Sequence, residues 1–189
     1  MCVDLPRFYA MIAGKFAEVN NTPLMTAWHT LSLALHLIAI ALWLGGIVFF
    51  LIVVGPAVQQ LEPKIAIKTM NQARIGLENM SWTAIGLLVL TGAFSLVARS
   101  QMNAAPPDQF YLYTLGAKLV VFLTMAVHHC LQVFKYSPAI SSLTRQLPLN
   151  TIAWPEPLLS HWRRWFLLLK INAALGPIAV LLGLALVKS

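Results

Sequence analysis

Four long apolar runs dominate this sequence and constrain its fold more than any other feature. They cover residues 28–54, 80–98, 111–134 and 165–187. Each run is long enough for an α-helix to cross about 30 Å of hydrocarbon, because a helix rises about 1.5 Å per residue. Only 10% of the 189 residues are charged, whereas a soluble domain carries about 25%. The sequence therefore predicts an integral membrane protein.

The polar segments between these runs predict how the runs are connected. Backbone groups inside a bilayer must be satisfied internally, so we expect an all-α, antiparallel bundle of four transmembrane helices. Residues 55–79 and 135–164 are expected to form the first and third loops, and residues 1–189 a single membrane domain. Apolar side chains at helical spacing within residues 1–27 predict a short N-terminal amphipathic helix on the membrane surface.

The basic residues indicate how the bundle is oriented. The net charge of +7 is spread over the loops, which favours a membrane-orientation signal over nucleic-acid binding. The positive-inside rule places the first and third loops in the cytoplasm and both termini on the non-cytoplasmic side of the inner (plasma) membrane. The cytoplasmic set is Lys64, Lys68, Arg74, Lys135, Arg145, Arg163 and Arg164, against Arg7, Lys15, Arg99 and Lys188 on the other side.

Small residues at helical spacing predict where the first two spans touch other helices. The hydrophobic effect does not drive helix association in lipid, so close approach at small residues is a common source of packing energy. We expect these positions to be contact faces without a chemical role. They are Ala34, Ala41 and Gly45 in the first span and Gly86, Gly92 and Ala93 in the second.

Ionisable side chains inside the spans are the main functional signal. They cost a few kcal/mol or more and usually face a partner, a cavity or a cofactor. His36 lies two to three turns inside the first span, and Lys118 lies about two turns inside the third, at a similar depth. Each also has an ordinary interpretation, because a neutral ring can hydrogen-bond across the bundle and a lysine can snorkel to the interface.

The third span carries two further histidines. His129 follows Lys118 by eleven residues and shares its face, whereas His128 points about 80° away. Helix rise separates Lys118 from His129 by about 16 Å, so a haem held by both His36 and His129 would need a strong tilt or offset. The sequence leaves open one outer site at His36, with Lys118 nearby, or a second site near His128 and His129.

A cofactor between the first and third spans is the functional interpretation. Neutral imidazole is a common axial ligand of haem iron, and helix-bundle cores accommodate haem. Haem also needs aromatic walls and a cation near its propionates. The candidate cofactor-binding residues are His36, Trp43, Lys118, Phe122 and Arg99, and the candidate metal ligands are His36, His129 and His128.

Three stretches resemble a known group of membrane domains. "LHLIAIALWLGGIVFFLIVVGPAV" (35–58) is similar to the first helix of CopD-like copper-resistance domains and of the membrane protoporphyrinogen oxidase HemJ. "RIGLENMSWTAIGLLVLTGAF" (74–94) resembles the second helix of both. "GAKLVVFLTMAVHHC" (116–130) is similar to the third helix of HemJ, whose Lys and later His correspond to Lys118 and His129.

The two branches of this group imply different functions. Resemblance to HemJ implies a b-type haem and an activity that needs His36 and Lys118, whereas resemblance to CopD implies copper handling across the membrane. A Cu(I) path favours Met and Cys ligands, and only Met125 lies on the Lys118–His129 face. The last span carries "INAALGP" where HemJ has an Asn-Glu-x-Pro pattern, which favours a non-enzymatic role.

These observations predict a b-type haem protein that is an electron-transfer or accessory subunit of a larger membrane redox complex. Its expected partners are the lipid bilayer and other membrane subunits or quinone. The alternatives are a CopD-type copper transport or resistance protein, a HemJ-like oxidase, and a structural subunit without a cofactor. The copper alternative would use His36, Met125, His128 and His129.

Overall fold

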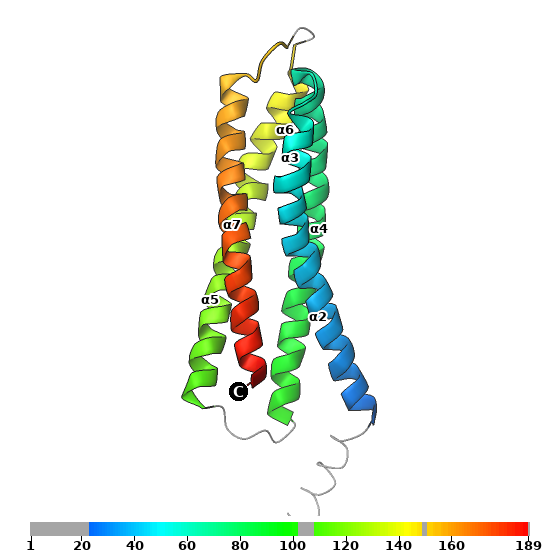
Figure 1. Cartoon of the computed structure of the whole chain (residues 1–189), viewed down its shortest axis with the longest axis vertical. Coiled ribbons are helices and arrows are strands. Elements are labelled where there is room, and N and C mark those ends of the chain that lie inside the picture. The colour runs from blue at the N-terminus through cyan, green and yellow to red at the C-terminus, as the bar shows by residue number, and fades with distance from the viewer. Residues whose placement is uncertain (1–22, 102–107, 149–150, 189) are drawn as a thin grey trace, which may run out of the picture.

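A computed structural model of the chain describes residues 23–101, 108–148 and 151–188. This part of the chain is all-helical, and several helices follow one another without a break (Figure 1). The predicted amphipathic helix lies largely outside the described residues. The elements are α2 (Pro23–Phe49), η1 (Phe50–Val54), α3 (Gly55–Val58), α4 (Pro63–Gln101), α5 (Gln109–Leu131), η2 (Gln132–Tyr136), α6 (Ser137–Arg145) and α7 (Glu156–Lys188).

Four helical segments are long and apolar enough to cross a membrane. They are Ala27–Val58, Pro63–Arg99, Gln109–Arg145 and Glu156–Leu186, and each overlaps one of the apolar runs. The prediction of an all-α chain with four such helices is therefore confirmed over the described residues. By length and composition, the chain is a multi-pass membrane protein.

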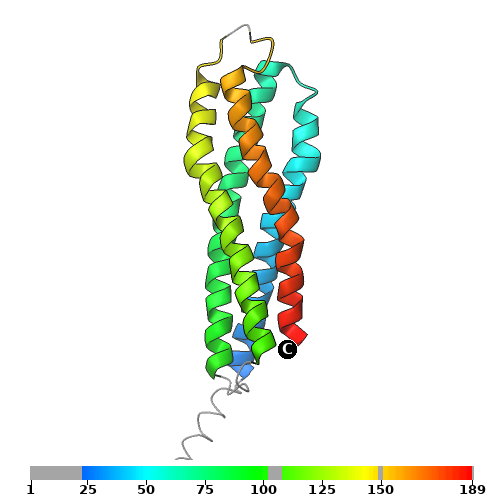
Figure 2. The same cartoon turned by 90° about the vertical axis from the view of Figure 1, so that its left-hand side faces the viewer.

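The helices run side by side and alternate in direction (Figures 1 and 2). The start of α2 and the end of α7 lie at the lower end of Figure 1, whereas α4 begins and α6 ends at the upper end. α2 packs along α4, α5 packs along α7, and α6 joins the two pairs through contacts with α4 and α7. The two ends of the described chain therefore lie on one side of the bundle.

Two segments predicted as loops are mostly helix. Within the first, α4 already begins at Pro63, a residue suited to the first helical turn because its missing N–H would be unpaired there anyway. The third predicted loop contains α6, which leaves only residues 146–155 as the connection to α7. The 39 residues of α4 span about 58 Å, so the polar ends of the helices extend beyond about 30 Å of hydrocarbon.

Two prolines explain the π-helical segments η1 and η2. Pro56 and Pro138 each follow the start of a new helical segment and have no N–H to donate. Directly before each proline the helix widens: the N–H of Gly55 bonds to the carbonyl of Phe50, and that of Ser137 to the carbonyl of Gln132. Each π turn keeps the backbone hydrogen-bonded next to a proline, as π-bulges do.

The main contact face of α2 is a different stripe of residues from the predicted one. Ala39, Trp43 and Ile47 are buried in the core. Ala34, Ala41 and Gly45 are exposed on the outside of the chain.

The glycines at which helices contact each other closely also differ from the predicted ones. A side chain at Gly86 or Gly92 would meet nothing within 4 Å, so these glycines do not mark the contact between helices. A Cβ at Gly46 would instead overlap Met80 of α4, and one at Gly176 would overlap Leu44 of α2.

Candidate functional site

His36 lies on α2 and is half-buried, with its ring against α4. Its Nδ1 lies 2.7 Å from Oγ1 of Thr91, and that hydroxyl lies 2.6 Å from the carbonyl oxygen of Leu87. A carbonyl oxygen can only accept, so the hydroxyl proton goes to Leu87 and the Thr91 oxygen accepts from His36. The ring therefore carries its proton on Nδ1 and a lone pair on Nε2.

Lys118 lies on α5 and is half-buried. Its ammonium interacts electrostatically with the His36 ring. Nζ lies 3.4 Å from the point where a Cβ would stand if Gly183 on α7 carried a side chain. Within the described part of the chain it forms no ion pair. His36 and Lys118 thus lie on two different helices, within electrostatic range of each other.

An aromatic pair links α2 to α5 above this histidine. The rings of Trp43 and Phe122 meet edge to face, with centroids 6.1 Å apart and planes at 77°. Trp43 is buried, and its Nε1 has no hydrogen-bond partner among the described residues. Trp43 follows His36 by two turns, and Phe122 follows Lys118 by one turn, so the pair lies on the side of the His36–Lys118 layer that faces the upper end of Figure 1.

Arg99 lies apart from this layer. Its guanidinium is 4.0 Å from the centroid of the Tyr111 ring, which is a cation–π contact between the end of α4 and the start of α5. Arg99 also lies about 12 Å along α4 from Thr91, since eight residues separate them. The structure therefore gives Arg99 a role in joining the lower ends of two helices and does not bring it to His36.

His128 and His129 face different helices. The His129 ring is 3% exposed and meets the ring of Trp82 on α4 edge to face at 5.1 Å. Its Nε2 has no hydrogen-bond partner among the described residues. Nδ1 of His128 lies 3.0 Å from Oδ1 of Asn172 on α7, and the Asn172 amide nitrogen donates to the carbonyl of Met125. His128 thus contacts α7 and His129 contacts α4, so the two rings do not face a common metal site.

A metal-binding cluster is also absent from the described residues as a whole. No three or more His, Cys, Asp or Glu side chains among them are placed to hold a metal ion together. Met125 is buried in the core, at 2% exposure. The three candidate ligands His36, His128 and His129 thus form no joint cluster among the described residues.

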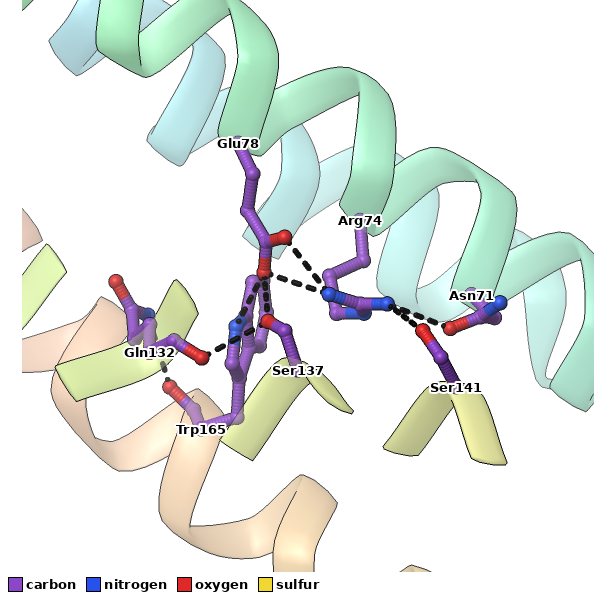
Figure 3. Close-up of polar contacts among 7 residues, drawn as sticks. All are labelled: Asn71, Arg74, Glu78, Gln132, Ser137, Ser141 and Trp165. Atoms are coloured by element: carbon purple, nitrogen blue, oxygen red, sulfur yellow. Dashed lines mark hydrogen bonds and ion pairs between the residues drawn. The ribbon is translucent and has the colours of Figure 1, made fainter. Parts of the chain in front are cut away.

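A buried ion pair near the upper end was missed by the sequence prediction. Arg74 on α4 is 1% exposed, and its Nη1 lies 2.8 and 2.7 Å from the two carboxylate oxygens of Glu78. Its Nη2 donates to Oδ1 of Asn71 and to Oγ of Ser141, both at 2.8 Å (Figure 3). Arg74 was counted among the basic residues of the first loop, but it is buried and paired with Glu78, so we leave it out of the charge count for orientation.

The carboxylate of Glu78 connects three helices (Figure 3). Oε1 accepts hydrogen bonds from Oγ of Ser137 at the start of α6 and, at 3.1 Å, from Nε1 of Trp165 on α7. Gln132 on η2 completes the set by donating from Nε2 to the backbone carbonyl of Trp165. We call these residues, with Asn71, Arg74 and Ser141, the Arg74–Glu78 network. The i, i+4 spacing of Arg and Glu in "RIGLE" is the one sequence signal that could have indicated it.

Comparison with protein-family models, with curated proteins and with solved structures gives no match for this chain. The fold, the His36–Lys118 layer and the Arg74–Glu78 network define its class as a multi-pass, four-helix membrane protein with a buried ion pair and a histidine that faces a neighbouring helix.

Proposed function

We propose that this chain is a membrane protein of the CopD/HemJ-like group that binds b-type haem, with His36 as an axial ligand of the iron. The observation that carries the proposal is the contact between the His36 ring and Thr91, from which the tautomer of the ring is assigned. Thr91 holds the Nδ1 proton and leaves the lone pair on Nε2, which is the nitrogen a metal would take. Metal-binding histidines commonly donate their other N–H to a fixed acceptor in this way.

The neighbouring side chains fit a haem in chemical type. Lys118 supplies a cation for a propionate group, and Trp43 with Phe122 supplies aromatic surface. Arg99, engaged with Tyr111, is no longer part of the proposed set. A bound haem would supply one-electron redox chemistry. His36 would hold the iron, and Thr91 would keep its ring in one tautomer.

We further propose that the protein is an electron-transfer or accessory subunit, with other membrane subunits or quinone as its partners. Copper has less support, because His36, His128 and His129 each face a different neighbour and Met125 is a core residue. The proposed location is the inner membrane, with both termini on the non-cytoplasmic side. After removal of Arg74, the remaining basic residues of the first and third predicted loops still outnumber those at the opposite end.

The visible spectrum of the purified protein tests the haem proposal. Protein expressed with haem supplied should show a Soret band and, on reduction, an α-band. His36→Ala should abolish both bands, whereas His161→Ala should retain them. His161 is a suitable control because its Nδ1 already bonds to the carbonyl of Pro157 near the start of α7. Wild-type protein without a Soret band, or equal loss of the band in both variants, would overturn the proposal.

The closeness of His36 and Lys118 favours one second candidate, a HemJ-like oxidase. Purified protein would then convert protoporphyrinogen to fluorescent protoporphyrin in the presence of an electron acceptor. Lys118→Met should remove this activity while the Soret band remains. Absence of activity in wild-type protein that carries haem would leave the electron-transfer role and exclude the oxidase.

A further inference from the structure

An open cavity of about 460 Å³ lies at the upper end of the bundle, between the first turns of α4 and the end of α6. Lys64 and Lys68 line it from α4, and Arg145 lines it from the last turn of α6. Asn71 and Thr144 complete the wall nearest the Arg74–Glu78 network. The cavity lies far from His36 and is independent of the proposed haem site.

The charge of this basic cavity is not balanced by its lining. No acidic side chain lines it, and the described residues form no ion pair with Lys64, Lys68 or Arg145. α4 begins at Pro63, so the positive end of the helix dipole also lies here. Three cations around one cavity indicate an anionic ligand.

Asn71 adds neutral donors to the cavity. Its Oδ1 accepts from Nη2 of Arg74, which fixes the orientation of the amide and turns Nδ2 away from the guanidinium (Figure 3). Among the described residues, Nδ2 has no acceptor. The buried network thus holds an amide donor on the wall of the cavity beside the three cations.

We propose that the basic cavity binds a phosphate group. Lysine ammonium groups and an arginine fork, together with an amide N–H, are the donors that phosphate oxygens prefer. The open cavity of about 460 Å³ has room for more than an inorganic phosphate ion, so we take the phosphate to be part of a larger molecule. The two sources of such a group at this end of the bundle are the headgroup of an anionic phospholipid and a soluble organic phosphate.

The test uses the full chain in nanodiscs and a pair of charge-matched variants. The cavity variant is Lys68→Gln with Arg145→Gln, and the control is Arg163→Gln with Arg164→Gln. All four side chains are exposed and basic, but the control pair on α7 does not line the cavity. Circular dichroism and thermal unfolding first establish that both variants are folded. The conservative variant Lys68→Arg with Arg145→Lys keeps the charge and should bind like the wild type.

The two sources of phosphate are then separated by probe. Titration of phosphatidylglycerol into phosphatidylcholine nanodiscs, followed by native mass spectrometry, should show bound anionic lipid that is weakened about tenfold or more in the cavity variant and less than about twofold in the control. Glycerol 3-phosphate added to pure phosphatidylcholine nanodiscs should show the same pattern if the ligand is a soluble phosphate. Equal binding of both probes by wild type and cavity variant, or equal loss in the control, would overturn the proposal.

Discussion

Thr91 and His36 share one hydrogen bond, and that bond decides which ring nitrogen is free. The threonine oxygen is available as an acceptor only because its own proton is held by the carbonyl of Leu87. A backbone carbonyl one turn earlier in α4 therefore sets the tautomer of a histidine on α2. This relay would not be visible in the sequence, because Thr91 and His36 are 55 residues apart.

Replacing Thr91 by valine should weaken the proposed haem site. Valine has nearly the shape of threonine but no oxygen, so the His36 ring loses its acceptor. We expect haem affinity to fall about 10- to 100-fold, the usual effect of removing such an outer-shell partner. Haem titration followed at the Soret band measures the change. Thr91→Ser keeps the hydroxyl and is expected to bind within about threefold of wild type; equal effects of the two variants would contradict the role of the hydroxyl.

The Arg74–Glu78 pair makes a prediction about stability. Glu78→Gln leaves the buried guanidinium without its counter-charge and should lower the free energy of unfolding by about 3–5 kcal/mol. Glu62→Gln, an exposed residue before α4, should change it by less than about 0.5 kcal/mol. Denaturant titration in one detergent, followed by tryptophan fluorescence, compares the variants.

The double replacement of this pair separates charge from packing. Arg74→Met with Glu78→Leu removes both charges and fills the space with apolar side chains. Replacing a buried ion pair in this way often leaves the stability of a protein unchanged or raises it. Here Trp165 and Ser137 would lose an acceptor, so we expect a loss of about 1–3 kcal/mol. A loss equal to that of Glu78→Gln would contradict this expectation, because it would show that an unpaired guanidinium adds no cost of its own.

At the scale of elements, two adjacent glycines of α2 have different surroundings. A side chain at Gly46 would overlap Met80 and approach Leu77 on α4, whereas one at Gly45 would enter open space. The two residues are about 100° apart on the helix. The sequence prediction chose the wrong one because an apolar face that packs on protein and one that packs on lipid have the same composition.

Leucine at each of these glycines gives a matched pair of variants. Gly46→Leu should overpack the contact between α2 and α4 and lower the free energy of unfolding by about 1–3 kcal/mol. Gly45→Leu carries the same gain in helix propensity but meets no neighbour, so it should be neutral or stabilising. Thermal unfolding in the same detergent measures both, and equal melting temperatures would contradict the packing of α2 on α4.

At the scale of the whole molecule, the sequence predicted the four spanning helices and their alternating direction. Hydropathy carries this information because the bilayer imposes a minimum apolar length. The sequence did not reveal the packing of the polar upper end, where Arg74 and Glu78 form a buried pair within α4. It placed His36 and Lys118 at one depth, but the partner of each side chain depends on how the helices pack and rotate.

The orientation of the molecule gives a last prediction. In a Cys2→Ser, Cys130→Ser background, a cysteine at Gln109, at the lower end, should react with an impermeant maleimide on intact bacterial cells. A cysteine at Gln60, in the connection between α3 and α4, should react only after permeabilisation. Both positions are exposed, so both should label in permeabilised cells. The reverse pattern on intact cells would place the basic cavity outside.

The π turns η1 and η2 have a consequence for how this chain should be aligned with others. A π turn holds one residue more than the α-helical turn it replaces, so loss of one residue there restores an α-helix and leaves the flanking segments in place. A deletion elsewhere in a spanning helix would rotate everything beyond it by about 100°. An alignment should therefore permit a one-residue gap inside the first and third spans, at residues 50–54 and 132–136. A distant relative that lacks the extra residue would be missed by a comparison that forbids gaps within membrane helices.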